Sequence, residues 1–134
     1  MSAAGLVPPL PECAPRLSVA YADGDVRALL ATPGVLAVIG FGARAPTGID
    51  DPRFLHVPLE APGGHAPCEV WRVGGEVRAG RDDGLAWAHD GALMFGAIEV
   101  DEAAHGGIAA AAEAAYARLL DATAGSGYPH LLRL

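Results

Sequence analysis

The stretch VLAVIGFGARAP, residues 35–46, decides between two folds. Its apolar run, followed by Gly40 and Gly42, satisfies the G-x-G-x-x-G/A pattern that follows the first strand of dinucleotide-binding folds. Such a site also needs a helix that begins inside the glycine motif, so that the helix N-terminus can hold a pyrophosphate. Here Pro46 and Gly48 interrupt the segment, and about ten residues before the next strand are too few for a helical crossover. We therefore reject a nucleotide site and interpret the glycines as a tight turn after a strand.

Composition and charge limit the number of domains and the kinds of partner that the chain can have. It has 134 residues, of which 51% are hydrophobic, so we expect one domain with one core. Its formal charge is −7, and its nine basic residues are all arginines that are scattered along the chain. This pattern is unlike a phosphate-binding surface and excludes nucleic acid as a partner. Cys13 and Cys68 are isolated, so the sequence predicts no metal, no cofactor and a reducing, cytoplasmic location.

The first residues differ in composition from the rest of the chain. Residues 1–15, MSAAGLVPPLPECAP, have no basic start and contain four prolines. A signal peptide or a membrane helix is therefore excluded there, and we expect a flexible leader. The folded domain is expected over residues 16–134.

Apolar periodicity predicts several strands and then one long helix. Strands are expected at 16–21, 35–42, 53–59, 68–73, 85–90 and 92–100. Asp90-Gly91 is the strongest hairpin signal. Asp101 is expected to cap a helix whose buried stripe comprises Ile108, Ala112, Ala115, Leu119 and Ala122, widened by Tyr116 and Leu120. Residues 129–134 then resume as an extended segment beside 92–100. The predicted fold class is α+β: a mixed sheet of about six strands with one long C-terminal amphipathic helix packed on one face.

Several segments, read in order, carry a resemblance to a known family. They are VIGFG at 38–42, CEVWRVGGEVRAG at 68–80, AHDGALMFGAIEV at 88–100, AAYARLLDA at 114–122 and GYPHLLRL at 127–134. Together they resemble the amino-terminal half of the chorismatase family, which includes 3-hydroxybenzoate synthases of bacterial pigment pathways and chorismate-hydrolysing enzymes of secondary metabolism. The most specific pieces are EVW at 69–71, LMFGAIEV at 93–100 and YPHLLR at 128–133. The resemblance implies a fold similar to the trimeric RidA/YjgF proteins, which have a chorismate mutase-like sheet and helix.

The resemblance also implies that the catalytic half is absent. In the family, a second half carries the glutamate thought to act as general acid and most of the residues that hold chorismate. This sequence ends at Leu134, where that half would begin. Residues 16–134 are therefore expected to form a chorismatase N-terminal-like domain that does not turn over chorismate alone. No catalytic residue is assigned.

Three residues are candidates for binding a substrate. Arg133 and His130 lie in the family-like YPHLLR segment, and the forked guanidinium of Arg133 suits a dicarboxylate such as chorismate. Arg72, next to Trp71, is expected to reach the same cleft. Each has a plainer alternative: a surface ion pair for Arg133, a structural hydrogen bond for His130 and a solvated side chain for Arg72.

Other chemistry-bearing residues are expected to be structural. Trp71 and Trp87 are predicted in the core or at a domain interface rather than as ligand platforms, and Cys68 is predicted to be buried. Glu69 and Glu99 lie on predicted strands, but linear positions do not establish a two-carboxylate site.

Three functions of different classes stay open. The first is the N-terminal domain of a chorismatase-like enzyme, which converts chorismate to pyruvate and a hydroxybenzoate or a dihydroxycyclohexadiene carboxylate. The second is a freestanding RidA-like oligomer with small-molecule sites between subunits and imine deaminase activity. The third is a non-catalytic partner subunit. In each case we expect a homo-oligomer or a complementary domain to pair with an open sheet edge, and no membrane partner.

Overall fold

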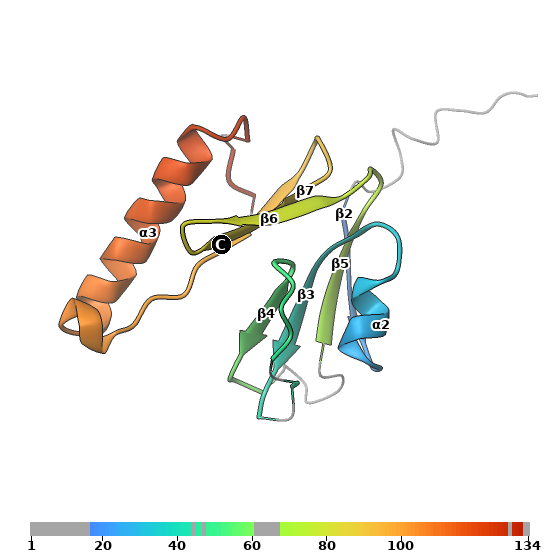
Figure 1. Ribbon diagram of the computed structural model, residues 1–134, viewed down its shortest axis with the longest axis horizontal. Helices are drawn as coiled ribbons and strands as arrows, with labels where there is room; N and C mark the ends of the chain where they lie inside the picture. The colour runs from blue at the N-terminus through green and yellow to red at the C-terminus, as the bar shows by residue number, and fades with distance from the viewer. Residues whose placement is uncertain (1–16, 44, 47, 61–67, 129, 133–134) are drawn as a thin grey trace, which may run out of the picture.

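Two β-sheets and two α-helices form the α+β fold of the described residues in this computed structural model (Figure 1). The structure describes residues 17–43, 45–46, 48–60, 68–128 and 130–132. The predicted leader at 1–15 therefore lies outside the described residues.

The elements alternate strands with short connections before the long helix. In chain order they are β2 (Leu17–Ala22), α2 (Val26–Leu30), β3 (Val35–Phe41), β4 (Phe54–Val57), β5 (Cys68–Val73), β6 (Arg78–Asp82), β7 (Leu85–His89), β8 (Met94–Ala97), the 3-10 turn η2 (Ala103–His105) and α3 (Ile108–Ala124). The prediction of one six-stranded sheet is wrong. Among the described residues, seven strands divide into a four-stranded sheet of order β2-β5-β3-β4 and a three-stranded sheet of order β6-β7-β8.

The four-stranded sheet is mixed. Its strand β5 is antiparallel to both neighbours, whereas β3 and β4 are parallel. No helix occupies the described residues between β3 and β4, so the rejected nucleotide site has no helix N-terminus to hold a pyrophosphate. The short link between the two strands correctly predicted that no helix lies there. It did not predict that β4 would nevertheless run parallel to β3.

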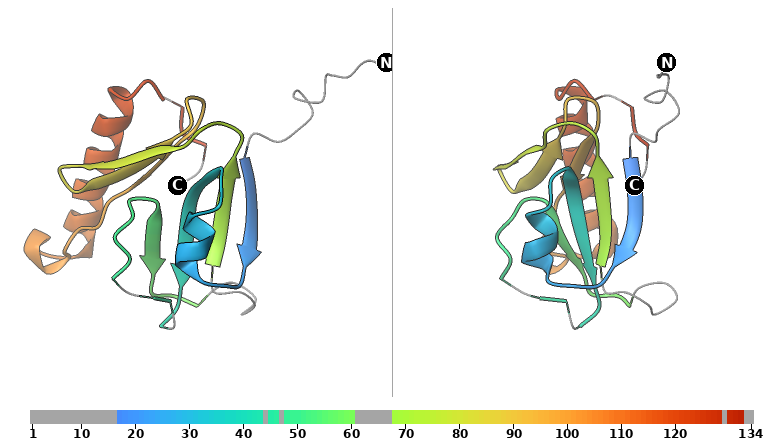
Figure 2. Two further views of the ribbon diagram at one scale, coloured as in Figure 1. Left: turned by 45° about the vertical axis from the view of Figure 1, so that its right-hand side comes forward. Right: turned by 90° about the vertical axis from the view of Figure 1, so that its right-hand side faces the viewer.

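The four-stranded sheet has a different neighbour on each face (Figure 2). The helix α2 covers one face, where the buried side chains are Val26, Leu30, Val35, Val38, Cys68 and Val70. On the other face the three-stranded sheet contributes to a second cluster, which comprises Leu36, Ala37, Ile39, Ala88 and Phe95. Cys68 is buried as predicted, and its burial raises the pKa of the thiol.

Two tight turns build the three-stranded sheet. The predicted hairpin at Asp90 is confirmed: it joins β7 to β8, and the Asp90 side chain accepts hydrogen bonds from the backbone N–H groups of Ala92 and Leu93. The preceding hairpin, between β6 and β7, turns at Asp83 and Gly84, which both have positive φ angles (51° and 85°). Sequence reasoning missed β6, although Asp-Gly at this turn is a hairpin signal of the same kind.

The long helix begins later than predicted and buries a different stripe. Asp101 accepts a hydrogen bond from Ala103 in η2, and α3 begins at Ile108 after Gly107. Only Ala111 is fully buried on α3. The predicted buried residues include large side chains that the structure exposes to solvent: Ile108 (72%), Tyr116 (51%) and Leu120 (61%).

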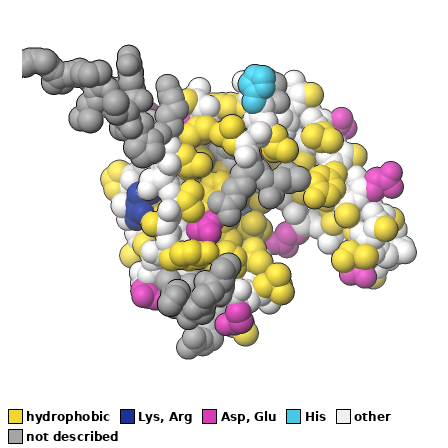
Figure 3. Space-filling view, turned by 180° about the vertical axis from the view of Figure 1, so that it is seen from behind, with side chains coloured by type: hydrophobic (Ala, Val, Ile, Leu, Met, Phe, Trp, Pro, Cys, Tyr) yellow, Lys and Arg dark blue, Asp and Glu magenta, His cyan; other side chains and the backbone are white. Residues whose placement is uncertain are grey.

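A long-range contact explains where α3 lies. Arg118 donates hydrogen bonds to the carbonyl oxygens of Asp82 (2.8 Å) and Asp83 (2.7 Å), which ties the helix to the β6–β7 turn. The helix therefore lies beside the three-stranded sheet and apart from the four-stranded sheet (Figures 1 and 2). Seen from behind, hydrophobic side chains gather over the four-stranded sheet, and a notch separates this sheet from α3 (Figure 3). The expected packing of this long helix on one face of the main sheet is thus wrong.

The predicted final strand is not formed in the described residues. His130, Leu131 and Leu132 have no strand pairing, and both leucines are exposed. Pro129, Arg133 and Leu134, the other members of the predicted segment, lie outside the described residues.

Candidate functional site

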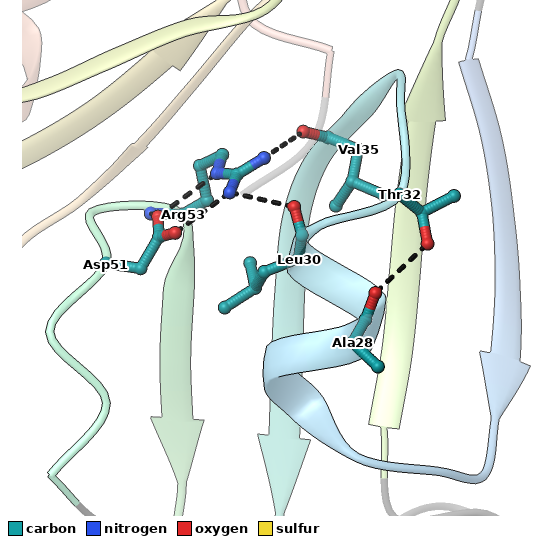
Figure 4. Close-up of polar contacts among 6 residues, drawn as sticks. All are labelled: Ala28, Leu30, Thr32, Val35, Asp51 and Arg53. Carbon is teal, nitrogen blue, oxygen red and sulfur yellow. Dashed lines mark hydrogen bonds and ion pairs between the residues drawn. The ribbon is translucent and has the colours of Figure 1, made fainter.

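Two open hollows lie beside Arg53, at the end of α2. Their volumes are about 570 Å³ and 330 Å³, and both are lined by Leu30, Ala31 and Arg53. The guanidinium of Arg53 is already occupied, because it donates to the carbonyl oxygens of Leu30 (2.9 Å) and Val35 (3.2 Å) and forms an ion pair with Asp51 (2.8 Å; Figure 4). Its hydrogen bond holds the pKa of Asp51 below the ordinary value. Arg53 therefore has a structural role at these hollows, and Arg27, which also lines the smaller one, is the other cationic side chain there.

The predicted substrate-binding residues do not meet in the described structure. Arg72 is half-buried on β5, where strand alternation places it on the face covered by α2 and opposite to Trp71. His130 is exposed beyond α3. None of the three ion pairs among the described residues includes Arg72 or His130. Arg133 lies outside the described residues, and its role stays a prediction.

Trp71 connects the two sheets, as expected of an interface aromatic. Its ring packs edge-on against Phe95 of β8, with ring centroids 5.8 Å apart. Its indole N–H donates to the Oε1 atom of Glu69 at 2.6 Å. One tryptophan therefore serves both the packing between the sheets and a buried carboxylate.

Glu69 is the one charged residue that is buried among the described residues, with 7% of its surface exposed. Its cross-strand partners are Tyr21 on β2 and Ile39 on β3, so all three side chains share the face of the sheet turned away from α2. The described part of the chain contains three ion pairs, and none of them includes Glu69. Removing a carboxylate from water without a cationic partner is costly, which marks this residue as a candidate for function.

Aromatic rings from both neighbouring strands meet over β5. Tyr21 of β2 and Phe41 of β3 have ring centroids 6.5 Å apart at an interplanar angle of 51°, although β5 lies between their strands. Tyr21 remains 46% exposed. Glu69 therefore lies among Tyr21, Phe41 and Trp71, in what we call the acidic aromatic site: a single carboxylate bordered by aromatic rings from three strands.

Sequence reasoning missed most of this site. The E-x-W spacing of Glu69 and Trp71 places both on one face of a strand and was a usable signal. The approach of Tyr21 and Phe41 depends on the register of three strands, which the sequence does not reveal. Glu99, which was predicted on a strand, follows the end of β8, and it is exposed rather than buried with Glu69.

The described histidines and acids do not form a metal or acid–base centre. The ring Nε2 of His56, on the edge strand β4, donates to the carbonyl oxygen of Gly42 at 2.9 Å. His89 stacks on Trp87, with ring centroids 5.3 Å apart, and the ring of Tyr128 is tilted by 37° to it, with centroids 5.7 Å apart. Within the described ranges, no group of three or more His, Cys, Asp or Glu residues could hold a metal ion. Likewise, none of the helices seen there is long and apolar enough to cross a membrane.

Comparison with known proteins identifies the second half of the chain. Residues 69–134 match the family model described as chorismatase FkbO/Hyg5-like, N-terminal. A chorismatase of Streptomyces hygroscopicus is 38% identical over 65 residues, which are 48% of this chain and 18% of that protein. The aligned stretch thus spans about a fifth of the relative's length. The family match begins within β5 and includes the Glu69–Trp71 pair. Residues 69–134 of this chain therefore belong to the N-terminal domain of the chorismatase family.

Proposed function

We propose that this chain is the N-terminal part of a chorismatase-type catalyst whose substrate is chorismate or a close analogue. The proposed reaction releases pyruvate and leaves a hydroxybenzoate or a dihydroxycyclohexadiene carboxylate. The observation that carries the proposal is the family match over residues 69–134, which the relative in Streptomyces hygroscopicus supports. The proposal places the protein in the cytoplasm, as its isolated cysteines predict.

We also propose that the chain does not complete this reaction alone. A dicarboxylate needs cationic donors that are free to turn toward it. In the described structure Arg53, Arg81 and Arg118 already pair with Asp51, Asp50 and Asp83 respectively. Arg27, Arg72 and Arg78 belong to none of these ion pairs, but they lie on three different elements, α2, β5 and β6. The buried carboxylate of Glu69 would repel an anionic substrate at the face of the four-stranded sheet turned away from α2. The missing donors and the general acid are expected to come from a further part of the protein.

Such a part has surfaces on which to pack. The exposed stripe of α3, formed by Ile108, Tyr116 and Leu120, faces solvent with no covering element in the described structure. Apolar surface of this kind is typical of an interface. We propose that a complementary domain or a second copy of the chain covers it. The expected likeness to RidA/YjgF proteins stays a prediction.

A domain exchange tests the family function directly. Residues 69–134 would replace the aligned stretch of the Streptomyces hygroscopicus chorismatase, and pyruvate release from chorismate would be measured by a coupled assay. We expect the chimaera to keep activity and the 134-residue chain alone to show none. A folded chimaera without activity would contradict the family function, and pyruvate release by the single chain would contradict its dependence on another part. A second chimaera carries Glu76→Gln, at an exposed position between β5 and β6, and serves as the control. It should be as active as the first chimaera.

A further inference from the structure

The strand β2 forms one edge of the four-stranded sheet and lacks the features that usually protect such an edge. Its sequence is LSVAYA, residues Leu17–Ala22, which contains no charged residue and no proline. All six residues pair with β5 in one antiparallel register without a bulge. On its other side β2 pairs with no strand of the described residues. Such an edge presents unpaired backbone N–H and C=O groups and can accept a further strand.

Among the described residues, the other three sheet edges are each protected. The strand β4, at the far edge of the same sheet, has four residues, and Pro58 follows it directly. The strand β6, at one edge of the three-stranded sheet, carries Arg78, Arg81 and Asp82. The strand β8, at the other edge, has four residues and contains Gly96. Short length, proline and charge are the usual means of preventing strand addition, so β2 differs from the other edges in being able to accept a strand.

Charges at the two ends of β2 select a partner and its direction. In the sequence Arg16 directly precedes the strand and Asp23 directly follows it. Two copies of β2 that pair antiparallel bring the positive end of each strand beside the negative end of the other, whereas parallel copies bring like charges together. Antiparallel pairing of identical strands is also the arrangement that a two-fold axis generates, so both ends are matched at once.

We propose that β2 pairs antiparallel with β2 of a second copy of this chain, which joins two four-stranded sheets into one continuous sheet in a two-fold symmetric dimer. The two-fold axis keeps equivalent faces of both copies on one side, so Val19 and Tyr21 of one copy meet the same residues of the other. Both side chains lie on the face turned away from α2 and are 41% and 46% exposed. Pairs of aromatic and β-branched side chains are favourable across neighbouring strands, so the dimer covers both.

This interface goes beyond the proposed chorismatase function and does not depend on it. The chimaera that tests the reaction receives residues 69–134 only and therefore lacks β2. Its failure would leave the dimer untouched, and a monomeric 134-residue chain would leave the family function untouched. The interface is also separate from the exposed stripe of α3, which lies apart from the four-stranded sheet (Figures 1 and 2).

Sedimentation velocity of the 134-residue protein over a range of concentrations tests for the dimer. A strand pair buries little surface, so we expect a dissociation constant of about 10–100 µM. Val19→Lys places a charge in the middle of the edge and should weaken the dimer about tenfold or more, with circular dichroism to confirm the fold. Leu59→Lys changes another exposed apolar residue outside β2 and should dimerise like the wild type. A wild-type monomer at about 500 µM, or equal dimerisation of Val19→Lys, would overturn the proposal.

Reversal of the terminal charges tests the antiparallel direction. Asp23→Arg brings two guanidinium groups together at each end of the antiparallel pair, and we expect the dimer to weaken about fivefold. Arg16→Asp combined with Asp23→Arg restores opposite charges and should recover the wild-type dissociation constant to within about twofold. An unchanged dimer in the single variant, or no recovery in the double variant, would overturn the antiparallel pairing.

Discussion

The indole N–H of Trp71 donates to the Oε1 atom of Glu69 across 2.6 Å, and both side chains lie on one face of β5 because they are two residues apart. The same indole packs edge-on against Phe95 of the other sheet. A polar contact within one strand is thereby coupled to the packing of the two sheets.

Removal of the Trp71 indole donor should lower the free energy of unfolding more than removal of the Glu69 charge. Trp71→Phe keeps an aromatic ring against Phe95 but leaves the Glu69 carboxylate without this hydrogen bond, so we expect a loss of about 1–3 kcal/mol in the free energy of unfolding. Glu69→Gln keeps an acceptor, and we expect a smaller loss. Urea unfolding of both variants measures the difference. A Trp71→Phe variant as stable as Glu69→Gln would show that the hydrogen bond contributes little.

Arg53 should be a major determinant of stability. Arg53→Ala removes the donor to two carbonyl oxygens, at the end of α2 and the start of β3, and we expect a loss of about 2–4 kcal/mol. Arg53→Lys keeps the charge without the planar fork and should fall between the wild type and the alanine variant. Urea midpoints for the three proteins give the comparison. Equal stability of the lysine and wild-type proteins would mean that charge alone matters.

The partner of Arg53 makes a pH-dependent contribution. The hydrogen bond from Arg53 lowers the pKa of Asp51 below its ordinary value of 3.8, so the folded state favours the ionised carboxylate. The stability that Asp51 adds is therefore present above that ordinary value and is lost as pH falls through the lower folded-state pKa. We expect the wild type to melt above Asp51→Asn at about pH 6, and the gap in Tm to shrink toward about pH 2. A gap that does not change with pH would exclude this linkage.

Two glycines that flank Trp87 should tolerate a methyl group very differently. A Cβ atom at Gly80 would lie 2.6 Å from a carbon of the Trp87 indole, whereas a Cβ at Gly96 would meet nothing closer than 3.8 Å. Both residues are cross-strand partners of Trp87, so the pair is matched in position. Gly80→Ala is expected to lose about 1–3 kcal/mol by overpacking, and Gly96→Ala to stay within about 0.5 kcal/mol of the wild type. Thermal unfolding of both variants measures the difference. Similar Tm values would show that the backbone at Gly80 does not lie as close to the Trp87 indole as described.

Local signals in the sequence predicted the strands better than their assembly. The apolar run at β3 and the Asp90 turn were found because each depends on neighbouring residues alone. The strand β6 was missed because Arg78, Arg81 and Asp82 give it no apolar face, although Asp83-Gly84 marks its turn. The helix α2 was missed because five residues are too few to show a helical period.

Long-range placement accounts for the remaining errors. The stripe of α3 was predicted from its own periodicity, but Arg118 ties the helix to the β6–β7 turn and leaves Tyr116 and Leu120 in solvent. In the same way, Glu69 and Trp71 share a face by spacing alone. Tyr21 joins them only because β2 pairs with β5 in one particular register.

The central position of β5 has a consequence for how this chain can be divided. The family match begins at Glu69, inside a strand whose two neighbours, β2 and β3, both precede the matched stretch. A fragment cut at that boundary would carry two unsatisfied rows of backbone N–H and C=O groups and would be prone to aggregate. Backbone groups are the same in every sequence, so the two flanking strands can be supplied by segments that share little identity with one another. The matched stretch of this chain therefore depends for its folding on two strands that precede it.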